Sequence, residues 1–235
     1  MRVRVTYLAV ITLICGGLVR RAGLARRKRA EGVRFRAAAG IAGPAAFTAA
    51  WIAGSLRQSG HGAMSLQISG LAAPDATDPW IMITGFVALG GCAVVFGNAL
   101  GREVGGAAPR LIQGAGALAV AAGVLRRDHM PLTTGAVSWH NQAHNVISLF
   151  IYADLIAFQL LLARRFRVTP PWRRWRPWLL ASGAATAAAM AVFIPNTSSP
   201  AAGALQRIAV SIPLVAMSAV AARLIKLHGR VNSAG

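Results

Sequence analysis

The stretch RRFRVTPPWRRWRPW, residues 164–178, decides the fold, because it separates two long apolar segments with a dense run of basic and aromatic side chains. It holds six arginines and three tryptophans, and Pro170 and Pro171 stop any helix that enters it. Arginine and tryptophan beside an apolar segment are typical of the headgroup level of a membrane. The stretch therefore predicts a loop at one membrane surface, with a transmembrane helix on each side.

The rest of the chain extends this pattern to six apolar segments, at about 37–56, 80–100, 109–125, 143–163, 177–194 and 207–225. Each segment is about 17–21 residues long, the length of helix that crosses a hydrocarbon core of about 30 Å. The chain has 235 residues, 55% hydrophobic and only 13% charged, so six spans leave no room for a separate soluble domain. We predict an all-α, polytopic membrane helix bundle with a six-span membrane domain at 37–228 and a short tail at 229–235.

The basic residues indicate how the spans are oriented. The gaps on one side of the predicted membrane hold 19 lysines and arginines, and Arg2 and Arg4 precede all gaps. The gaps on the other side hold four, which are Arg57, Arg126, Arg127 and Arg207. Positive charge stays cytoplasmic during insertion, so we expect a multi-pass protein of the cell membrane with both termini cytoplasmic. The net charge of +19 is then explained by orientation and by membrane lipids as partners, and it does not indicate nucleic-acid binding.

Residues 1–36 form a basic N-terminal segment with a short apolar run at 5–19. An apolar run of this length is typical of a signal-peptide core or of a marginal additional span. An interfacial or dispensable segment is the interpretation we favour, and an over-extended start site is a third alternative.

A polar cluster between the third and fourth spans is the first candidate site. If the fourth helix begins near Ser138, His140 and His144 are spaced i, i+4 and share one helix face. Two imidazoles at this spacing can bind one metal ion, and Asp128 could supply a third ligand or orient a histidine. A divalent metal is therefore a candidate cofactor. A metal-free acid–base site, and a polar helix start that only hydrogen-bonds its neighbours, remain alternatives.

Asp154 is the second candidate, because it falls near the middle of the fourth span. A carboxyl group at that depth costs several kcal/mol unless it is paired, hydrated or protonated. Asp154 follows His144 by ten residues, which is about 15 Å along a helix and within roughly 80° of the same direction. It could line the same interior cavity as a proton donor, or it could make a buried packing contact.

The outer side of the predicted topology also holds Asp75, Asp78, His61 and His129, so titratable groups gather there. Convergent polar groups over an apolar bundle are the default site hypothesis. We assign as candidate catalytic residues Asp128, His140, His144 and Asp154. We assign as candidate substrate-binding residues Ser69, Trp139, Asn141 and Tyr152.

The chain resembles the bacterial domain-of-unknown-function 998 family over residues 40–225. The resemblance rests on the small-residue-rich segment at 40–71 with its ISGL element at 68–71, on Asp128 preceding His140, and on LQRI at 205–208. It implies a six-span membrane protein without an assigned reaction, and it excludes the N-terminal segment. Gly70 stands where the family usually has an acidic residue, which weakens any catalytic role for Ser69.

Three classes of function follow from these features. The first is an intramembrane enzyme acting on a lipophilic small molecule, either by acid–base or metal-assisted hydrolysis of a lipid or by acid-initiated cyclisation of an isoprenoid, as in a terpene cyclase. The second is a non-catalytic scaffold, sensor or accessory subunit. The third is a small permease or exporter. The sequence determines neither the substrate nor the oligomeric state.

Overall fold

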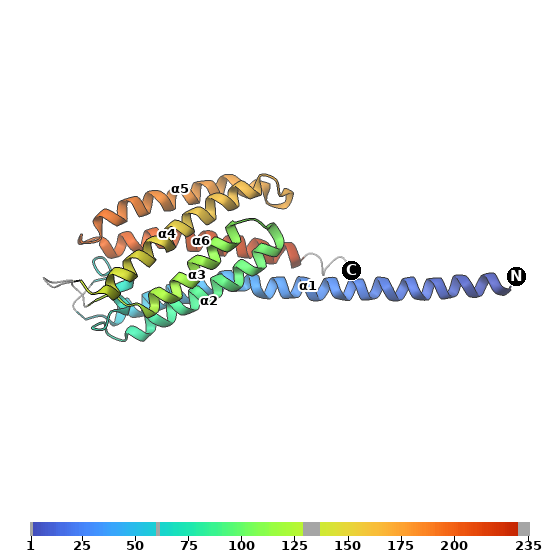
Figure 1. Ribbon diagram of the computed structural model, residues 1–235, viewed down its shortest axis with the longest axis horizontal. Helices are drawn as coiled ribbons and strands as arrows, with labels where there is room; N and C mark the ends of the chain where they lie inside the picture. Colours follow the sequence, from blue (N-terminus) through green and yellow to red (C-terminus); the bar gives the residue numbers. More distant parts are fainter. Residues whose placement is uncertain (1, 60–61, 129–136, 230–235) are drawn as a thin grey trace.

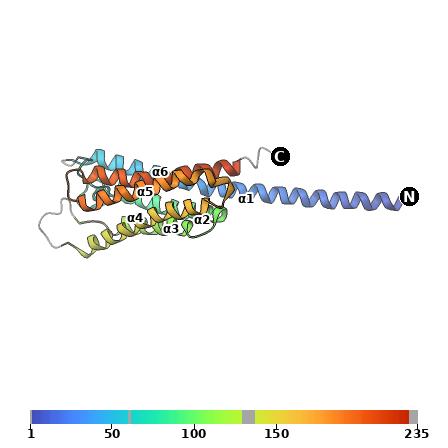
Figure 2. The ribbon, with the colours of Figure 1, turned by 90° about the horizontal axis from the view of Figure 1, so that it is seen from above.

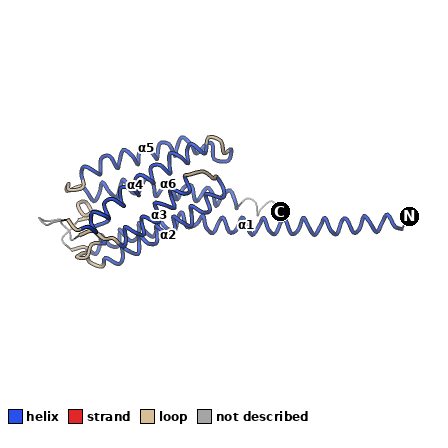
Figure 3. The backbone as a smooth tube through the Cα atoms, in the orientation of Figure 1, coloured by secondary structure: helices blue, strands red, loops and turns tan. Residues whose placement is uncertain are grey.

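The computed structural model describes residues 2–59, 62–128 and 137–229, with side chains from residue 27 onward (Figure 1). Its helices are α1 (Arg2–Arg57), α2 (Pro79–Val104), α3 (Ala108–Val124), α4 (Trp139–Phe166), α5 (Arg176–Phe193) and α6 (Ala202–Gly229). Short 3-10 helices occur at η1 (Ile68–Ala72), η2 (Pro170–Trp175) and η3 (Ile194–Asn196). The described ranges contain no strand (Figure 3), which confirms the all-α prediction. His61, His129 and residues 230–235 lie outside the described residues.

The helices match the predicted apolar segments, because each of the six segments lies, to within one residue, inside one helix. Within the described chain, five helical segments are long and apolar enough to cross a membrane, namely Arg27–Arg57, Pro79–Val104, Trp139–Phe166, Pro170–Asn196 and Ala202–Gly229. The apolar helix α3 is shorter, with 17 residues. The chain is thus a multi-pass membrane protein by helix length and composition.

Successive helices run up and down beside one another (Figures 1 and 2). The connections α1–α2, α3–α4 and α5–α6 meet at one end of the bundle, which we call the outer end after the predicted topology. The connections α2–α3 and α4–α5 lie at the other end, called the inner end. Helix α1 is continuous from Arg2 and extends well beyond the inner end, because its arginines, alanines and leucines are strong helix formers and its single proline, Pro44, lies within the bundle.

Close backbone contact joins α2 to α3. A Cβ atom added at Gly90 would collide with the carbonyl oxygen of Gly116, and one added at Gly116 would lie 2.6 Å from that of Gly90. Small residues permit such approach in membranes, where lipid supplies no hydrophobic drive between helices.

The core divides between the two ends of the bundle. Phe158, Phe166 and Trp172 are fully buried in a large cluster toward the inner end. Phe47, Ile68 and Leu71 belong to a smaller cluster toward the outer end, so η1 is a buried part of the outer loop. Apolar side chains also cover much of the outward-facing helix surface, as a lipid environment requires; they include Val87, Val95, Phe150, Leu161 and Val215.

Candidate functional site

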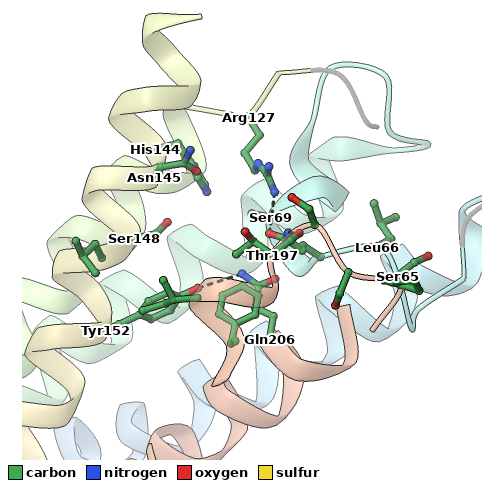
Figure 4. Close-up of a pocket in the computed structure, with 17 residues that line it drawn as sticks. Ser65, Leu66, Ser69, Arg127, His144, Asn145, Ser148, Tyr152, Thr197 and Gln206 are labelled. Carbon is green, nitrogen blue, oxygen red and sulfur yellow. Dashed lines mark hydrogen bonds between the residues drawn. The ribbon is translucent and has the colours of Figure 1, made fainter. Parts of the chain in front are cut away.

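A cavity of about 720 Å³ lies at the outer end of the bundle (Figure 4). Its walls come from the loop before η1 and η1 itself, the loop after α3, one face of α4, and the segment from η3 to the start of α6. This volume is within the range of small-molecule sites in proteins. Segments far apart in the sequence therefore meet around one space.

One face of α4 supplies the cavity with His144, Ser148 and Tyr152. These residues are spaced i, i+4 and i+8, so they form a row along the helix. The helix begins where Ser138 acts as its N-cap, accepting a hydrogen bond from Asn141 N at 3.2 Å. The cap places this row of side chains just inside the predicted membrane boundary.

The His144 ring is hydrogen-bonded to backbone carbonyl groups at the end of α3. Its side chain is 2% exposed, and Nδ1 lies 3.1 Å from the carbonyl oxygen of Ala122 and 2.8 Å from that of Leu125. Carbonyl oxygens only accept hydrogen bonds, so Nδ1 carries the hydrogen and, in the neutral ring, Nε2 carries the lone pair. Within the described part of the chain, no protein group hydrogen-bonds Nε2. The lone pair of Nε2 is therefore available to a bound molecule.

Tyr152 is fixed by Gln206 of α6. Gln206 donates from Nε2 to the Tyr152 hydroxyl at 3.1 Å and accepts from the backbone N–H of Ile68 at 2.6 Å. This chain of bonds links η1, α6 and α4 across the floor of the cavity (Figure 4). Because the Tyr152 oxygen accepts from Gln206, its own hydrogen remains to donate to a ligand.

Arg127 forms the wall of the cavity beside the loop after α3, which we call the upper wall after its place in Figure 4. Its side chain is 8% exposed; Nη1 donates to Gln67 Oε1 at 2.8 Å and Nε donates to Asn141 Oδ1 at 3.4 Å. Gln67 donates in turn to the carbonyl oxygen of Thr197 at 2.6 Å. Burial lowers the pKa of the Arg127 guanidinium from its ordinary value, while Tyr152 and Asp128 act in the opposite direction.

Arg207 is a second buried arginine of the outer end, and it has a structural role. Nη1 donates at 2.7 Å to the carbonyl oxygens of both Ala63 and Leu66, and Nη2 donates to the hydroxyl of Ser55 at 2.8 Å. The guanidinium also lies 5.3 Å from the centre of the Trp51 ring. Arg207 thus fastens the loop before η1 to α1 and α6.

Asp128 and Asn141 support the site without lining the cavity. The Asp128 carboxylate accepts from the backbone N–H of Ser138 at 2.8 Å and from the Ser138 hydroxyl. Asn141 is buried and accepts from the backbone N–H of Asp128 at 3.3 Å, in addition to its bond with Arg127. These contacts anchor the loop after α3 to the start of α4.

The other predicted site residues lie apart from the cavity. His140 is exposed, and its ring stacks on the exposed ring of Trp139 with centroids 3.7 Å apart. Asp154 is half-buried and faces Gly114 of α3, where its Oδ2 would lie 3.0 Å from an added Cβ. In the described residues, no group of three His, Cys, Asp or Glu side chains is arranged to hold a metal ion.

The structure therefore brings together three of the predicted residues, Ser69, His144 and Tyr152, with Asn141 directly behind them. Among the cavity residues that were not predicted, the most consequential are Arg127 and Gln206. The sequence contained features that could have indicated both residues. Arg127 and Arg207 are two of only four basic residues in the outer gaps, and Gln206 is a polar residue at the opening of an apolar segment.

A smaller pocket of about 60 Å³ lies next to the cavity, toward the bundle centre. The two spaces share as lining residues Ser69, His144, Ser148, Tyr152 and Gln206. Below these, the smaller pocket is lined by apolar side chains that include Phe86, Ile151, Leu155, Leu214 and Met217. The site therefore changes from polar to apolar with depth.

Comparison with known proteins identifies the family and leaves the reaction open. No curated protein and no solved structure matches the chain. A family model described as "Protein of unknown function (DUF998)" matches residues 41–223, which leaves out the N-terminal segment as the resemblance implied. Because this match covers most of the chain, the protein belongs to the DUF998 family.

Proposed function

We propose that all six helices, including the shorter α3, cross the membrane and that both termini are cytoplasmic. The distribution of basic residues supports this orientation, since the inner-end loops and helix termini carry most of the arginines. The cavity then opens at the membrane face opposite the cytoplasm.

Cysteine labelling tests this orientation. In a chain with Cys15→Ser and Cys92→Ser, exposed Ser198 and exposed Arg174 are each replaced by cysteine. A membrane-impermeant maleimide added outside intact cells should label the Ser198→Cys protein and not the Arg174→Cys protein. The opposite labelling would reverse the topology, and labelling of both positions from outside would contradict the six-span arrangement.

We further propose that the cavity binds an amphiphilic, lipid-like molecule. The observation that carries this proposal is that a cavity with many polar side chains at the outer end and an apolar pocket in the bundle share five lining residues. A polar head fits among the amide, hydroxyl and guanidinium groups, and the small apolar pocket takes the first few carbon atoms of an apolar tail, the rest of which would lie in the bilayer. This matches a molecule that already lies in the bilayer with its head at the interface.

His144 is the group that would act on such a molecule. Its Nδ1–H is fixed by two carbonyl oxygens, which leaves Nε2 to accept a proton from a water or a substrate hydroxyl. In a hydrolysis, the water oxygen forms the new bond, Nε2 takes the water proton, and the protonated ring returns a proton to the leaving oxygen. The Tyr152 hydroxyl can donate a hydrogen bond to the oxygen on which charge develops. We therefore favour an acid–base enzyme with a lipophilic substrate.

The test compares two histidines one helical turn apart. His144→Asn keeps a donor near the position of Nδ1 and removes Nε2, while His140→Asn changes an exposed ring outside the cavity. The purified full chain in vesicles is incubated with a mixture of phospholipids and isoprenoid alcohols, and products are identified by mass spectrometry. We expect His144→Asn to lower turnover by about 10²–10⁴-fold and His140→Asn to change it less than twofold. Equal turnover in wild type and His144→Asn would remove His144 from the reaction.

A further inference from the structure

We infer that the upper part of the cavity is an oxyanion site built around Arg127, so that the bound amphiphile carries an anionic head such as a phosphate or a carboxylate. This inference rests on the proposed amphiphile binding and specifies the substrate class. Figure 4 shows Arg127 extending from the loop after α3 toward Ser69 and Thr197, into the space where the head would lie.

The first support is the set of donors that Arg127 leaves unused. A guanidinium has five N–H donors in one plane. Arg127 uses Nε toward Asn141 and Nη1 toward Gln67. Among the residues that the structure places, no acceptor meets Nη2. Two amide oxygens thus orient the guanidinium and leave the two N–H groups of Nη2 to donate to the oxygens of a planar or tetrahedral oxyanion.

The second support is the charge of the cavity wall. Over its described lining, the cavity has Arg127 as its charged residue and contains no carboxylate. The carboxylate of neighbouring Asp128 accepts two hydrogen bonds from Ser138 and does not line the cavity. A buried cation whose hydrogen-bond partners are neutral amides is costly, and an anionic ligand offsets that cost.

The third support is the type of polar group around Arg127. The remaining upper wall is rich in hydroxyl groups that can donate, contributed by Ser69, Thr197, Ser198 and Ser199. Hydroxyls and a guanidinium bind phosphate and carboxylate oxygens well, whereas a cationic head would meet no opposite charge. Arg207 adds positive charge behind the wall, because it bonds the carbonyl oxygen of Leu66, next to Gln67.

The position of His144 agrees with an anionic amphiphile. His144 lines both the polar cavity and the apolar pocket, so its ring lies where the proposed head and tail would join. An ester or phosphoester bond at that junction would lie between the Arg127 guanidinium and the imidazole.

A thermal-shift and competition assay on the full chain in uncharged detergent tests the inference. Dioleoyl phosphatidic acid is compared with dioleoylglycerol, which has the same tails without the phosphate, and with inorganic phosphate alone. Each ligand is measured with wild type, Arg127→Gln, Arg127→Lys and Arg126→Gln. Arg126 is the matched control, because it is the adjacent arginine and is exposed.

We expect phosphatidic acid to bind wild type at least about tenfold more tightly than dioleoylglycerol. Arg127→Gln should remove this difference, Arg127→Lys should retain part of it, and Arg126→Gln should leave it unchanged. If Arg127→Gln does not fold, the comparison of Arg127→Lys with Arg126→Gln decides the inference, because the exposed inner-end arginines also attract phosphatidic acid to wild type.

Other outcomes separate this inference from the proposed function. If both lipids bind wild type equally, amphiphile binding stands and the oxyanion site is wrong. If inorganic phosphate binds through Arg127 and displaces no lipid, the oxyanion site stands and amphiphile binding is wrong. If none of the three ligands binds, both are overturned.

Discussion

The two ends of the bundle use arginine and aromatic side chains in opposite ways. At the inner end, the six arginines of residues 164–178 are all exposed, and Trp172 is buried against Phe166 with ring centroids 4.7 Å apart. At the outer end, Arg127 and Arg207 are buried and hydrogen-bonded, while Trp80 and Trp139 are 62% and 65% exposed. Packed rings fill the inner end, whereas hydrogen-bonded polar groups surround a cavity at the outer end.

The comparison shows that arginine is found in two different settings in this protein, exposed at the inner end and, in two cases, buried at the outer end. Arginines at the inner end are the basis of the predicted orientation, and their exposed side chains make few structural contacts. The predicted topology has only four arginines at the outer end, and two of these four, Arg127 and Arg207, are buried with specific hydrogen-bond partners. The exceptions to the charge pattern locate the candidate site better than the pattern itself.

The largest expected effect concerns the aromatic packing of the inner end. Trp172→Ala should lower the free energy of unfolding by about 3–5 kcal/mol, because it removes a fully buried indole from the core. Unfolding by a denaturing surfactant in mixed micelles measures the loss. Trp178→Ala, at a position that is 39% exposed, is the control and should cost clearly less than Trp172→Ala, because a smaller part of its ring is buried. Equal losses would show that the inner end is not held by this stacked ring.

The next effect concerns the polar support of the outer end. Arg207→Gln removes charged hydrogen bonds to the carbonyl oxygens of Ala63 and Leu66, the second of them buried, and should lower the free energy of unfolding by about 2–3 kcal/mol. Arg57→Gln is the matched control, because Arg57 is exposed and pairs with Asp78 at the surface. It should change stability by less than about 1 kcal/mol. If the free energy of unfolding falls no more in Arg207→Gln than in Arg57→Gln, Arg207 does not stabilise the outer end more than a surface arginine does.

A smaller effect is expected where the polar network meets the cavity. Gln67→Met keeps the side-chain length and removes the bonds to Arg127 and Thr197, so stability should fall by about 1–2 kcal/mol. Phosphatidic acid should also bind about tenfold more weakly, since the guanidinium loses one of its two orienting groups. Gln142→Met, at an exposed position of α4, should change neither quantity. Unchanged lipid affinity in Gln67→Met would show that Arg127 does not need this orientation.

The smallest effect is expected at Asp154. Asp154→Asn changes a half-buried carboxyl beside Gly114 that lines neither the cavity nor the apolar pocket. Turnover and lipid binding should therefore stay within twofold of wild type. A loss as large as that of His144→Asn would instead place Asp154 on the proton path and extend the site toward α3.

Much of the fold was predictable, because apolar length and helix-breaking residues are local properties of the sequence. Prolines 79, 109, 170 and 177 stand at or near the helix starts, where the sequence placed the edges of the spans. The burial of η1 was not predictable in the same way. Ile68 and Leu71 are a short apolar run within a polar loop, and only the assembled outer end provides the surface that covers them.

The candidate site was predictable in part. His144 and Tyr152 lie on the helix face that the cavity uses, but Asp154 does not, although it is within roughly 80° of His144. The row formed by residues 144, 148 and 152 advances about 40° at each step in the opposite sense, so its centre turns away from Asp154. Which face of α4 meets a cavity depends on where α6 packs, and this is a long-range property.

The contact of His144 with the end of α3 has a consequence for repeated proton exchange. The Nδ1–H bond to the carbonyl oxygens of Ala122 and Leu125 is present in both the neutral and the charged ring, since only Nε2 gains or loses a proton. The imidazole can therefore change its charge without releasing its anchor or moving a helix. A group arranged in this way returns to its starting state after each cycle with little reorganisation of the surrounding protein.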